Sequence, residues 1–314
     1  MNSLIMDVQY GDTGKGRVAS WLLQKNKYDW AVRFNGGANA GHTIVKNSIT
    51  HKLHQIPCGA LYGVKSAIDT GTVLDLHKLE KEIKENNIDK NLLYISNNVN
   101  LITEKHLEQD KDGSGIGTTK SGIAYAYSDR ALKRGIRVGN VSSLQEDYNT
   151  YSGLVPFKEN ENILFESAQG IMLDVDYGVH PFTTSSSVFP SSVYNIAEKI
   201  AVMKPYITRV GEGPPHFEDV PELREIGQEY GATTGRPRKC CWIILDELKY
   251  ALQITKPHKL VMTKVDIIKK MNKVGVWDNN KLIEFKPDDL INYLVDKFKI
   301  THISDSPDGD ILEL

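Results

Sequence analysis

The chain has 314 residues, of which 40% are hydrophobic and 25% are charged. This ordinary globular composition excludes collagen-like and disordered chains, and a formal net charge of −2 gives no reason to expect binding to nucleic acid or to a membrane surface. The sequence has no apolar run long enough for a transmembrane helix, and its first residues lack the features of a signal peptide. Its three cysteines lack CxxC spacing, so we expect free thiols in a reducing cytoplasm.

Apolar runs bounded by glycine-rich turns alternate with segments of helical period, which predicts an α/β fold with a mostly parallel sheet covered by helices. In chain order, strands are expected at Leu4–Val8, Tyr28–Phe34, Leu92–Ser96, Ile163–Phe165, Tyr206–Val210 and Leu260–Thr263. Helices are expected through Val18 and Leu22, after the N-cap Asp75, and at Ser191–Ala201, Trp242–Ile254 and Asp288–Phe298. Because no repeat, linker or change of composition marks a boundary, we expect residues 1–314 to form a single domain.

A glycine-rich segment, Gly11-Asp12-Thr13-Gly14-Lys15-Gly16, lies between the first strand and the first helix. Backbone N–H groups and the helix dipole can hold phosphate at such a place, although an ordinary tight turn is an equally good interpretation. The segment is not a Walker A loop, because Gln9 replaces the first glycine and Gly16 follows the lysine. Asp12 is a catalytic candidate, since a carboxylate beside phosphates repels them unless it binds Mg²⁺ or takes a proton.

Two further segments follow expected strands, where open α/β sheets bind ligands. Asn39–Thr43 includes His42, which is either a structural histidine or a proton donor or phosphate contact. In Thr263–Asp266, an aspartate can accept hydrogen bonds from guanine N1–H and N2–H₂ while the lysine stem covers the base. The alternative there is a plain strand end with an exposed ion pair.

A third segment, Gly231–Lys239, combines three cations with two threonines and glycines, and arginine suits bidentate binding of carboxylates. Glu166–Gly170 places polar groups directly after an apolar strand, and Ile116–Thr119 has a weaker pattern of the same kind. Together the segments predict an α/β enzyme that handles phosphates, with a guanine-type pocket and a carboxylate-binding loop. They do not define the reaction.

Taken in order, these segments resemble the adenylosuccinate synthetase family from the first strand to the last. The matching pieces are Gln9-Tyr10-Gly11-Asp12, Gly14-Lys15-Gly16, Asn39–Thr43, Leu53–Pro57, Ile116–Thr119, Arg134–Gly139, Ala168-Gln169-Gly170, Thr208–Gly211, Gly231–Arg236, Thr263–Asp266 and, loosely, Ile303–Pro307. The resemblance implies the family's α/β fold, which is related to that of phosphate-loop proteins. It also implies a two-step ligation. Asp12 takes the purine N1 proton, O6 attacks the γ-phosphate of GTP, and the amine of L-aspartate displaces the resulting phosphate at C6.

The resemblance also implies roles for individual residues. The catalytic residues are Asp12, His42, which donates to the GTP phosphates, and Gln169, which steadies the O6 anion. Asp12 and the Gly41 carbonyl bind Mg²⁺. Nucleotides and their phosphates are held by Gly11, Thr13, Gly14, Lys15, Gly16, Asn39, Gly41, Thr43, Thr119, Thr184, Val210, Lys264, Asp266, Ser304 and Ser306. The aspartate carboxylates are held by Thr233, Thr234, Arg236 and Arg238. The family works as a homodimer, in which Lys133 is expected to reach the partner's nucleotide.

Several positions depart from the family pattern. Thr13 replaces the usual glutamate, Lys133 the cross-subunit arginine, and Asp305-Ser306 a threonine-glycine pair. Thr13 and the compact length resemble a viral branch, which acts on dGMP instead of IMP and usually has serine where this chain has Asp12. The retained acid favours IMP, with GMP or dGMP as the alternative, and an altered base pocket leaves ATP open as a donor. A GTP-binding protein without turnover is a further hypothesis. It is disfavoured because binding alone does not need the set Asp12, His42, Gln169, Arg236 and Arg238 together.

Overall fold

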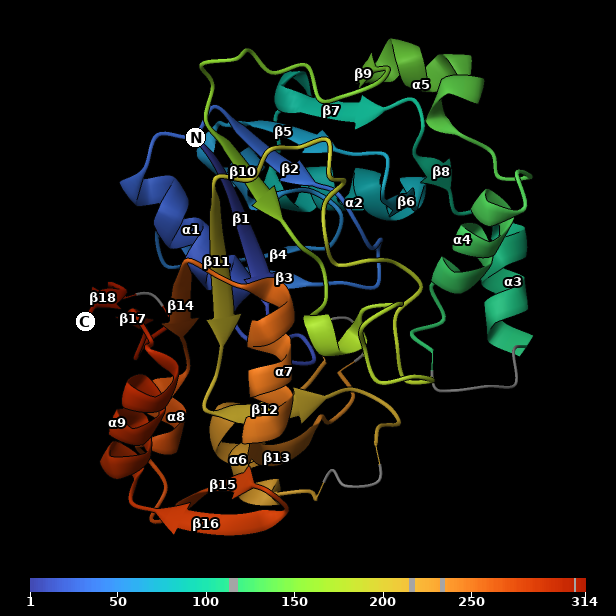
Figure 1. Ribbon diagram of the computed structural model, residues 1–314. Helices are drawn as coiled ribbons and strands as arrows, with labels where there is room; N and C mark the ends of the chain where they lie inside the picture. The colour runs from blue at the N-terminus through green and yellow to red at the C-terminus, as the bar shows by residue number, and fades with distance from the viewer. Residues whose placement is uncertain (113–117, 215–217, 232–234, 308) are drawn as a thin grey trace.

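The computed structural model describes residues 1–112, 118–214, 218–231, 235–307 and 309–314. Its centre is a ten-stranded sheet in the order β18-β17-β14-β11-β1-β10-β2-β5-β7-β9, and every pair of neighbours except β17 and β18 is parallel (Figure 1). The strands are β1 (Asn2–Asp7), β2 (Trp30–Arg33), β5 (Lys65–Ile68), β7 (Leu93–Ser96), β9 (Asn149–Tyr151), β10 (Ile163–Glu166), β11 (Glu198–Met203), β14 (Lys259–Met262), β17 (His302–Ile303) and β18 (Leu312–Glu313). The predicted α/β fold with a mostly parallel sheet is confirmed.

Both faces of this sheet are buried, because successive side chains of a strand point to opposite faces. Leu4 and Met6 of β1 belong to one hydrophobic cluster, while Ile5 between them belongs to another. The helices α1 (Lys15–Lys25) and α2 (Leu76–Asn86) contribute to the cluster around Ile5. On the other face lie side chains of α7 (Leu245–Thr255) and α9 (Pro287–Phe298). The sheet is thus the middle layer of the fold.

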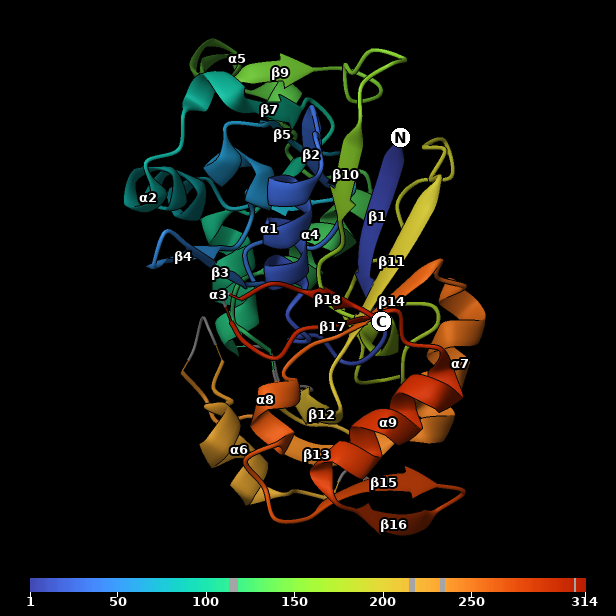
Figure 2. The same ribbon diagram turned by 90° about the vertical axis from the view of Figure 1, so that its left-hand side faces the viewer.

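A second sheet lies beyond the carboxyl ends of β11 and β14 (Figures 1 and 2). It has four strands in the order β12 (Tyr206–Arg209), β13 (Lys239–Ile244), β15 (Val274–Asp278) and β16 (Lys281–Phe285). The helices α6 (Pro221–Gly227) and α8 (Val265–Ile268) lie near it, and α6 contacts both α8 and β13. This part of the chain faces the edge of the large sheet where its parallel strands end.

The remaining elements are short and lie around the large sheet. The helices are α3 (Glu104–Asp112), α4 (Ile123–Ala131) and α5 (Ser142–Asp147), with 3₁₀ turns η1 (Cys58–Tyr62), η2 (Lys90–Leu92), η3 (Val138–Asn140) and η4 (Ile171–Leu173). The strands are β3 (His42–Lys46) paired with β4 (Ile49–Leu53), and β6 (Val73–Leu74) paired with β8 (Asn100–Leu101). In the described part of the chain, no helix is both long and apolar enough to cross a membrane. All three cysteines are free and buried.

One helix prediction is wrong, and a second helix begins later than expected. The segment expected as a helix at Ser191–Ala201 is irregular up to residue 197 and then enters β11. A central parallel strand is apolar on both faces, so its spacing can imitate a buried helix. The helix expected at Trp242–Ile254 begins only at Leu245, because the preceding residues complete β13. The expected strand Tyr206–Val210 forms as β12, but it pairs antiparallel with β13 in the second sheet.

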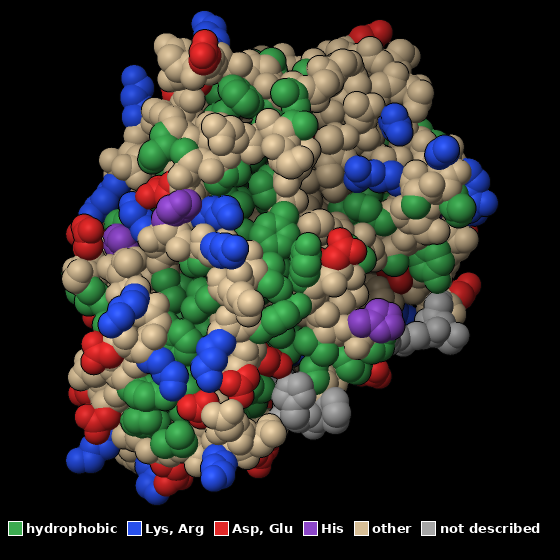
Figure 3. All heavy atoms as spheres, viewed as in Figure 1, with side chains coloured by type: hydrophobic (Ala, Val, Ile, Leu, Met, Phe, Trp, Pro, Cys, Tyr) green, Lys and Arg blue, Asp and Glu red, His purple; other side chains and the backbone are tan. Residues whose placement is uncertain are grey.

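On the face drawn in Figure 3, acidic and basic side chains are interspersed with hydrophobic ones over its lower part. That mixture agrees with a formal net charge near zero.

Candidate active site

Four neighbouring strands of the large sheet each lead into a charged or polar residue at the same edge. Asp12 follows β1, Gln169 follows β10, Lys204 follows β11 and Lys264 follows β14. The carboxyl ends of parallel strands meet at one edge, and open α/β sheets bind ligands there. The topology thus gathers residues that are far apart in the sequence.

The loop after β1 is shaped by the buried carboxylate of Asp7. One oxygen accepts the backbone N–H of Gln9 at 2.7 Å, and the other accepts the Thr13 hydroxyl at 2.6 Å and Lys15 Nζ at 3.2 Å. Lys15 Nζ also donates to the carbonyl of Gln169 at 2.6 Å, which ties this loop to the one after β10. The side chain of Thr13 is therefore directed into the protein, although the sequence analysis expected it among the phosphate-binding residues.

Three of the residues at this edge have left-handed backbone conformations. The φ angles are 57° at Asp12, 56° at Gln169 and 54° at Lys264. Such a conformation is unfavourable for residues other than glycine by roughly 1–2 kcal/mol. Strained backbone of this kind gathers at functional sites, where the surrounding structure holds it in place.

Two hollows open at this edge, with roughly 900 Å³ and 1080 Å³ of space between atoms. The first alone is lined by Gly11, Asn39, Thr119, Gln169 and Val210 among the predicted residues. The second alone is lined by Gly14, Gly16, Thr43, Lys264, Asp266, Ser304 and Ser306. Both are lined by Asp12, Lys15, Gly41, His42 and Arg238. We call these five residues the shared wall. A group bound at the shared wall is within reach of a ligand in the first hollow and of a ligand in the second.

The first hollow contains a polar atom that lacks a partner. The Oε1 atom of Gln169 is buried and has no hydrogen bond to any residue that the structure describes. Buried polar atoms are nearly always paired, and an exception at a cavity is typical of a ligand contact. The other end of this amide, Nε2, lies 3.5 Å from Oδ1 of Asn39.

His42 lies in the shared wall, but its ring nitrogens already have partners inside the protein. Nε2 is 3.3 Å from the guanidinium of Arg33, and Nδ1 is 3.6 Å from both Glu166 and the thiol of Cys58. Burial and the neighbouring Arg33 lower the pKa of His42 to about 4, so the ring is neutral at pH 7. A hydrogen bond from His42 to a phosphate requires the ring to leave one of these partners.

Asp12 is close to Arg238, which the sequence analysis assigned to carboxylate binding. Arg238 Nε lies 3.0 Å from Asp12 Oδ2, yet its N–H is not aimed well enough for a hydrogen bond. Arg238 also forms an ion pair with the buried carboxylate of Glu229. Burial works against the guanidinium charge, but Asp12 and Glu229 outweigh it and raise the pKa of Arg238. The arginine is thus a permanent cation at the shared wall.

Four predicted residues line neither hollow, and two cannot be placed. Thr184 is next to the first hollow, where its N–H donates to the carbonyl of Leu173 at 2.7 Å. Arg236 is exposed, and its carbonyl accepts the N–H of Gly231 at 2.8 Å. Lys133 lines a separate hollow with Arg130 and Arg137. Thr13 is buried as described above. Thr233 and Thr234 lie outside the described residues, as do residues 116 and 117.

The sequence analysis missed Lys204 and Glu229, and it gave no separate role to Arg209. Lys204 and Glu229 are fully buried. Arg209 lines the first hollow, and its buried Nη1 atom has no hydrogen bond to a residue in the described ranges. Lys204 stands between the apolar residues of β11 and Tyr206, and a lone charge in such a run signals a buried ion pair. The sequence does not show which carboxylate is its partner.

Comparison with known proteins identifies the family. The family model of adenylosuccinate synthetase matches residues 4–155 and 154–287. The adenylosuccinate synthetase of Thermosipho africanus is 36% identical over 88% of this chain and 82% of its own length, and that of Paramecium tetraurelia is 34% identical over 91% and 82%.

Solved structures agree. A fully ligated adenylosuccinate synthetase from Plasmodium falciparum superposes with a TM-score of 0.84, 26% identity and 99% coverage of both chains. The succinoaminodeoxyadenylate synthetase of cyanophage S-2L, bound to dGMP and dATP, shares the fold at a TM-score of 0.82 with 20% identity, over 99% of this chain and 95% of that one. The chain therefore belongs to the adenylosuccinate synthetase family of GTP-dependent ligases, and it forms a carbon–nitrogen bond between aspartate and a purine nucleotide.

Proposed function

We propose that the protein joins L-aspartate to C6 of IMP, with GTP as the phosphoryl donor, and so forms adenylosuccinate. The observation that carries the proposal is the shared wall between the two hollows. An acceptor purine in the first hollow and a donor nucleotide in the second would meet at Asp12, Lys15 and Arg238. Phosphoryl transfer depends mainly on such positioning and on electrostatic stabilisation.

In the first step, the carboxylate of Asp12 accepts the N1 proton of the purine. The electron pair thus released makes O6 a nucleophile, which bonds to the γ-phosphorus while the bond to the β-phosphate oxygen breaks and GDP leaves. Gln169 and Asn39 in the first hollow are suited to hold the edge of the base. Thr119 and Val210 line the same hollow, and Thr184 lies next to it. The product is a 6-phosphoryl purine with a good leaving group.

In the second step, the amine of aspartate attacks C6, and the O6 phosphate leaves as inorganic phosphate. Arg238 is suited to hold a carboxylate of aspartate, since its fixed planar charge can form paired hydrogen bonds. Arg236, Thr233 and Thr234 are proposed to complete this site. Because Arg238 already borders Asp12, aspartate held by it would approach the carbon that the first step has activated.

The donor nucleotide is proposed to occupy the second hollow. Gly14, Lys15 and Gly16 form the N-terminal end of α1, where N–H groups and the helix dipole favour phosphate. Lys264, Asp266, Ser304 and Ser306 lie farther along the same hollow. The carboxylate of Asp266 can accept N1–H and N2–H₂ of guanine, and adenine offers no N1–H. This contact would select GTP over ATP.

The residues of the shared wall fit the Mg²⁺ ion that the family uses. Mg²⁺ prefers oxygen ligands and usually binds one or two carboxylates together with substrate phosphates, and Asp12 and the carbonyl of Gly41 supply such oxygens beside both hollows. When bound there, the ion would neutralise charge on the phosphates during transfer. The cluster of His42, Cys58 and Glu166 is a poor alternative for Mg²⁺, because it is buried beside Arg33 and includes a thiol.

GMP or dGMP is the alternative acceptor, because one carboxylate at Asp12 could accept both N1–H and N2–H₂ of guanine. We favour IMP, since Asp12 is needed as the base for N1 and IMP has no 2-amino group to satisfy. We also propose a homodimer in which Lys133, with its φ of 61° beside Arg130 and Arg137, contacts the partner's nucleotide.

The test is release of inorganic phosphate from GTP in the presence of Mg²⁺ and aspartate, with IMP, GMP or dGMP supplied in parallel. Turnover with IMP alone is the expected result. Turnover with dGMP or GMP instead would show that the acceptor is a 2-amino purine nucleotide and not IMP. Absence of turnover with all three would refute the proposed function.

A further inference from the structure

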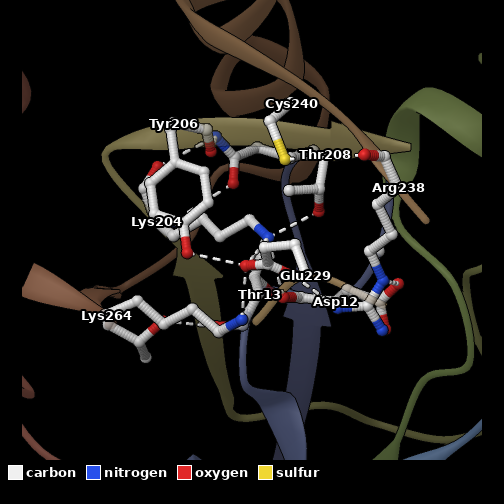
Figure 4. Close-up of polar contacts among 12 residues, drawn as sticks. Asp12, Thr13, Lys204, Tyr206, Thr208, Glu229, Arg238, Cys240 and Lys264 are labelled. Atoms are coloured by element: carbon white, nitrogen blue, oxygen red, sulfur yellow. Dashed lines mark hydrogen bonds and ion pairs between the residues drawn. The ribbon is translucent and has the colours of Figure 1, made fainter. Parts of the chain in front are cut away.

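Glu229 is a fully buried carboxylate that holds three cations from three different parts of the chain. Its Oε1 atom accepts from Lys264 Nζ at 2.6 Å and from Lys204 Nζ at 3.1 Å. Its Oε2 atom pairs with Arg238. The hydroxyl of Tyr206 donates to Oε1 at 2.6 Å. In Figure 4, Glu229 lies between Lys264 on one side and Arg238 on the other.

Each of the three cations leads to a different part of the candidate site. Lys264 follows β14 and lines only the second hollow, whereas Arg238 belongs to the shared wall. Lys204 is itself fully buried, and its Nζ donates to the carbonyl of Asp12 at 3.2 Å and lies 2.5 Å from the hydroxyl of Thr208. Glu229 lines neither hollow.

The three cations around Glu229 keep its carboxylate ionised. Burial alone would raise the pKa of Glu229, but Lys204, Lys264 and Arg238 outweigh burial and hold it well below its usual range. Glu229 is therefore ionised, and without its charge the three cations would repel one another across a few ångströms in a region shielded from water. Removal of one partner of a buried ion pair is far more disruptive than removal of an exposed one.

We propose that Glu229 is a positioning residue that couples the two hollows, because it fixes Arg238, Lys264 and the backbone of Asp12 relative to one another. The assignment of aspartate and GTP to Arg238 and Lys264 rests on the proposed function. Glu229 touches no substrate. Through Glu229, the position of Lys264 depends on the position of Arg238, and the position of Arg238 depends on that of Lys264.

The first experiment compares Glu229→Gln with the wild-type enzyme. The substitution keeps the shape of the side chain and removes its charge. The KM values of aspartate and of GTP should each rise about tenfold, a size typical of lost coupling between two sites. The KM of the acceptor nucleotide should change less than about twofold, because in the described part of the chain Asn39, Gln169 and Thr119 form no hydrogen bond or ion pair with Glu229 or its three cations.

Tyr206→Phe is the matched control. It removes another hydrogen bond to the same carboxylate but displaces no cation. If the effect of Glu229→Gln were merely structural, Tyr206→Phe would raise the same two KM values in proportion to its loss of thermal stability. The inference expects Tyr206→Phe to lower the melting temperature and leave both KM values within about twofold.

The second experiment is a double-mutant cycle with Lys264→Met. Lys264 does not line the first hollow, and it is partly exposed, so the variant should fold even if Glu229→Gln does not. Through Glu229, Lys264→Met should change the KM of aspartate at least about threefold, and this effect should vanish in the Glu229→Gln background. An unchanged KM of aspartate in Lys264→Met, or purely additive effects, would overturn the inference.

These outcomes are separable from failure of the proposed function. If the wild-type enzyme turns over no acceptor, the proposed function fails and the cycle has no meaning. If the wild-type enzyme turns over and the cycle is additive, the proposed function stands and the coupling through Glu229 is refuted.

Discussion

Asp7→Asn should disrupt the loop after β1 more than any other single isosteric change in it. The Asp7 carboxylate is buried and accepts hydrogen bonds from Gln9, Thr13 and Lys15. Asparagine keeps one acceptor oxygen but turns an NH₂ donor toward another partner. If the amide oxygen of asparagine stays with the N–H of Gln9, its NH₂ group faces Thr13 and Lys15. The Thr13 hydroxyl can rotate to accept a hydrogen bond from this NH₂ group, whereas the Lys15 ammonium has no lone pair and cannot.

The expected size follows from the burial of the pair. Lys15 and Asp7 are both nearly inaccessible to water, and breaking a buried ion pair by removing one partner destabilises a protein by about 3–5 kcal/mol. An unfolding entropy of about 2.1 cal/mol/K per residue gives roughly 0.66 kcal/mol/K for a chain of this length. The melting temperature should therefore fall by about 5–8 °C. The KM of GTP should rise as well, because Lys15 and Gly14 line the second hollow.

Thermal unfolding followed by circular dichroism measures the first effect, and phosphate release at varied GTP measures the second. Thr13→Val is the control, since it removes only the hydroxyl and leaves the ion pair. Loss of one neutral hydrogen bond is worth about 1 kcal/mol, or about 2 °C here, with an unchanged KM of GTP. The reasoning is refuted if Asp7→Asn melts within 2 °C of the wild type, or if Thr13→Val is the more damaging change.

Three other outcomes are expected. Asp12→Ala should abolish phosphate release but leave binding of GTP measurable by calorimetry; a fully active variant would exclude Asp12 as the base. Asp266→Asn should raise the KM of GTP and reduce the preference for GTP over ATP, which parallel assays with the two donors measure. Glu82→Gln tests a pH dependence: burial raises the pKa of Glu82 to about 7, so the folded state holds this proton more tightly than the unfolded chain. Wild-type stability should thus fall by about 2.5 kcal/mol relative to Glu82→Gln between pH 5 and pH 8 in urea unfolding, and parallel curves would contradict this.

Local signals in the sequence were sufficient for six strands (β1, β2, β7, β10, β12 and β14) and for most of the loops that follow them. Glycine-rich segments such as Gly11–Gly16 interrupt strong apolar runs, and the topology of a parallel sheet brings their ends to one edge. The segment at Ser191–Ala201 failed because a strand buried on both faces has no period of its own. The antiparallel pairing of β12 with β13 was also out of reach, since pairing partners 30 residues apart leave no local pattern.

Residues of the candidate site were predicted where a distinctive local segment marks them, and they were missed where only a distant partner reveals them. Asp12, Lys15 and His42 were predicted because each stands in a distinctive segment, and the structure places all three in the shared wall. Glu229 and Lys204 form an ion pair with each other across 25 residues of sequence, and no local pattern marks either residue. The partners of His42 were missed for the same reason, since Arg33 and Glu166 lie on two separate strands.

Because Asp12, Gln169 and Lys264 have left-handed backbone conformations, thermal stability and catalytic activity favour different residues at these three positions. Glycine at any of these positions would relieve backbone strain of roughly 1–2 kcal/mol, and it would remove a side chain that we propose to act in catalysis or binding. A selection for thermostability that ignores activity should therefore enrich glycine or asparagine at these three sites. An engineer who wants a more robust enzyme should hold them fixed and seek stabilising changes elsewhere.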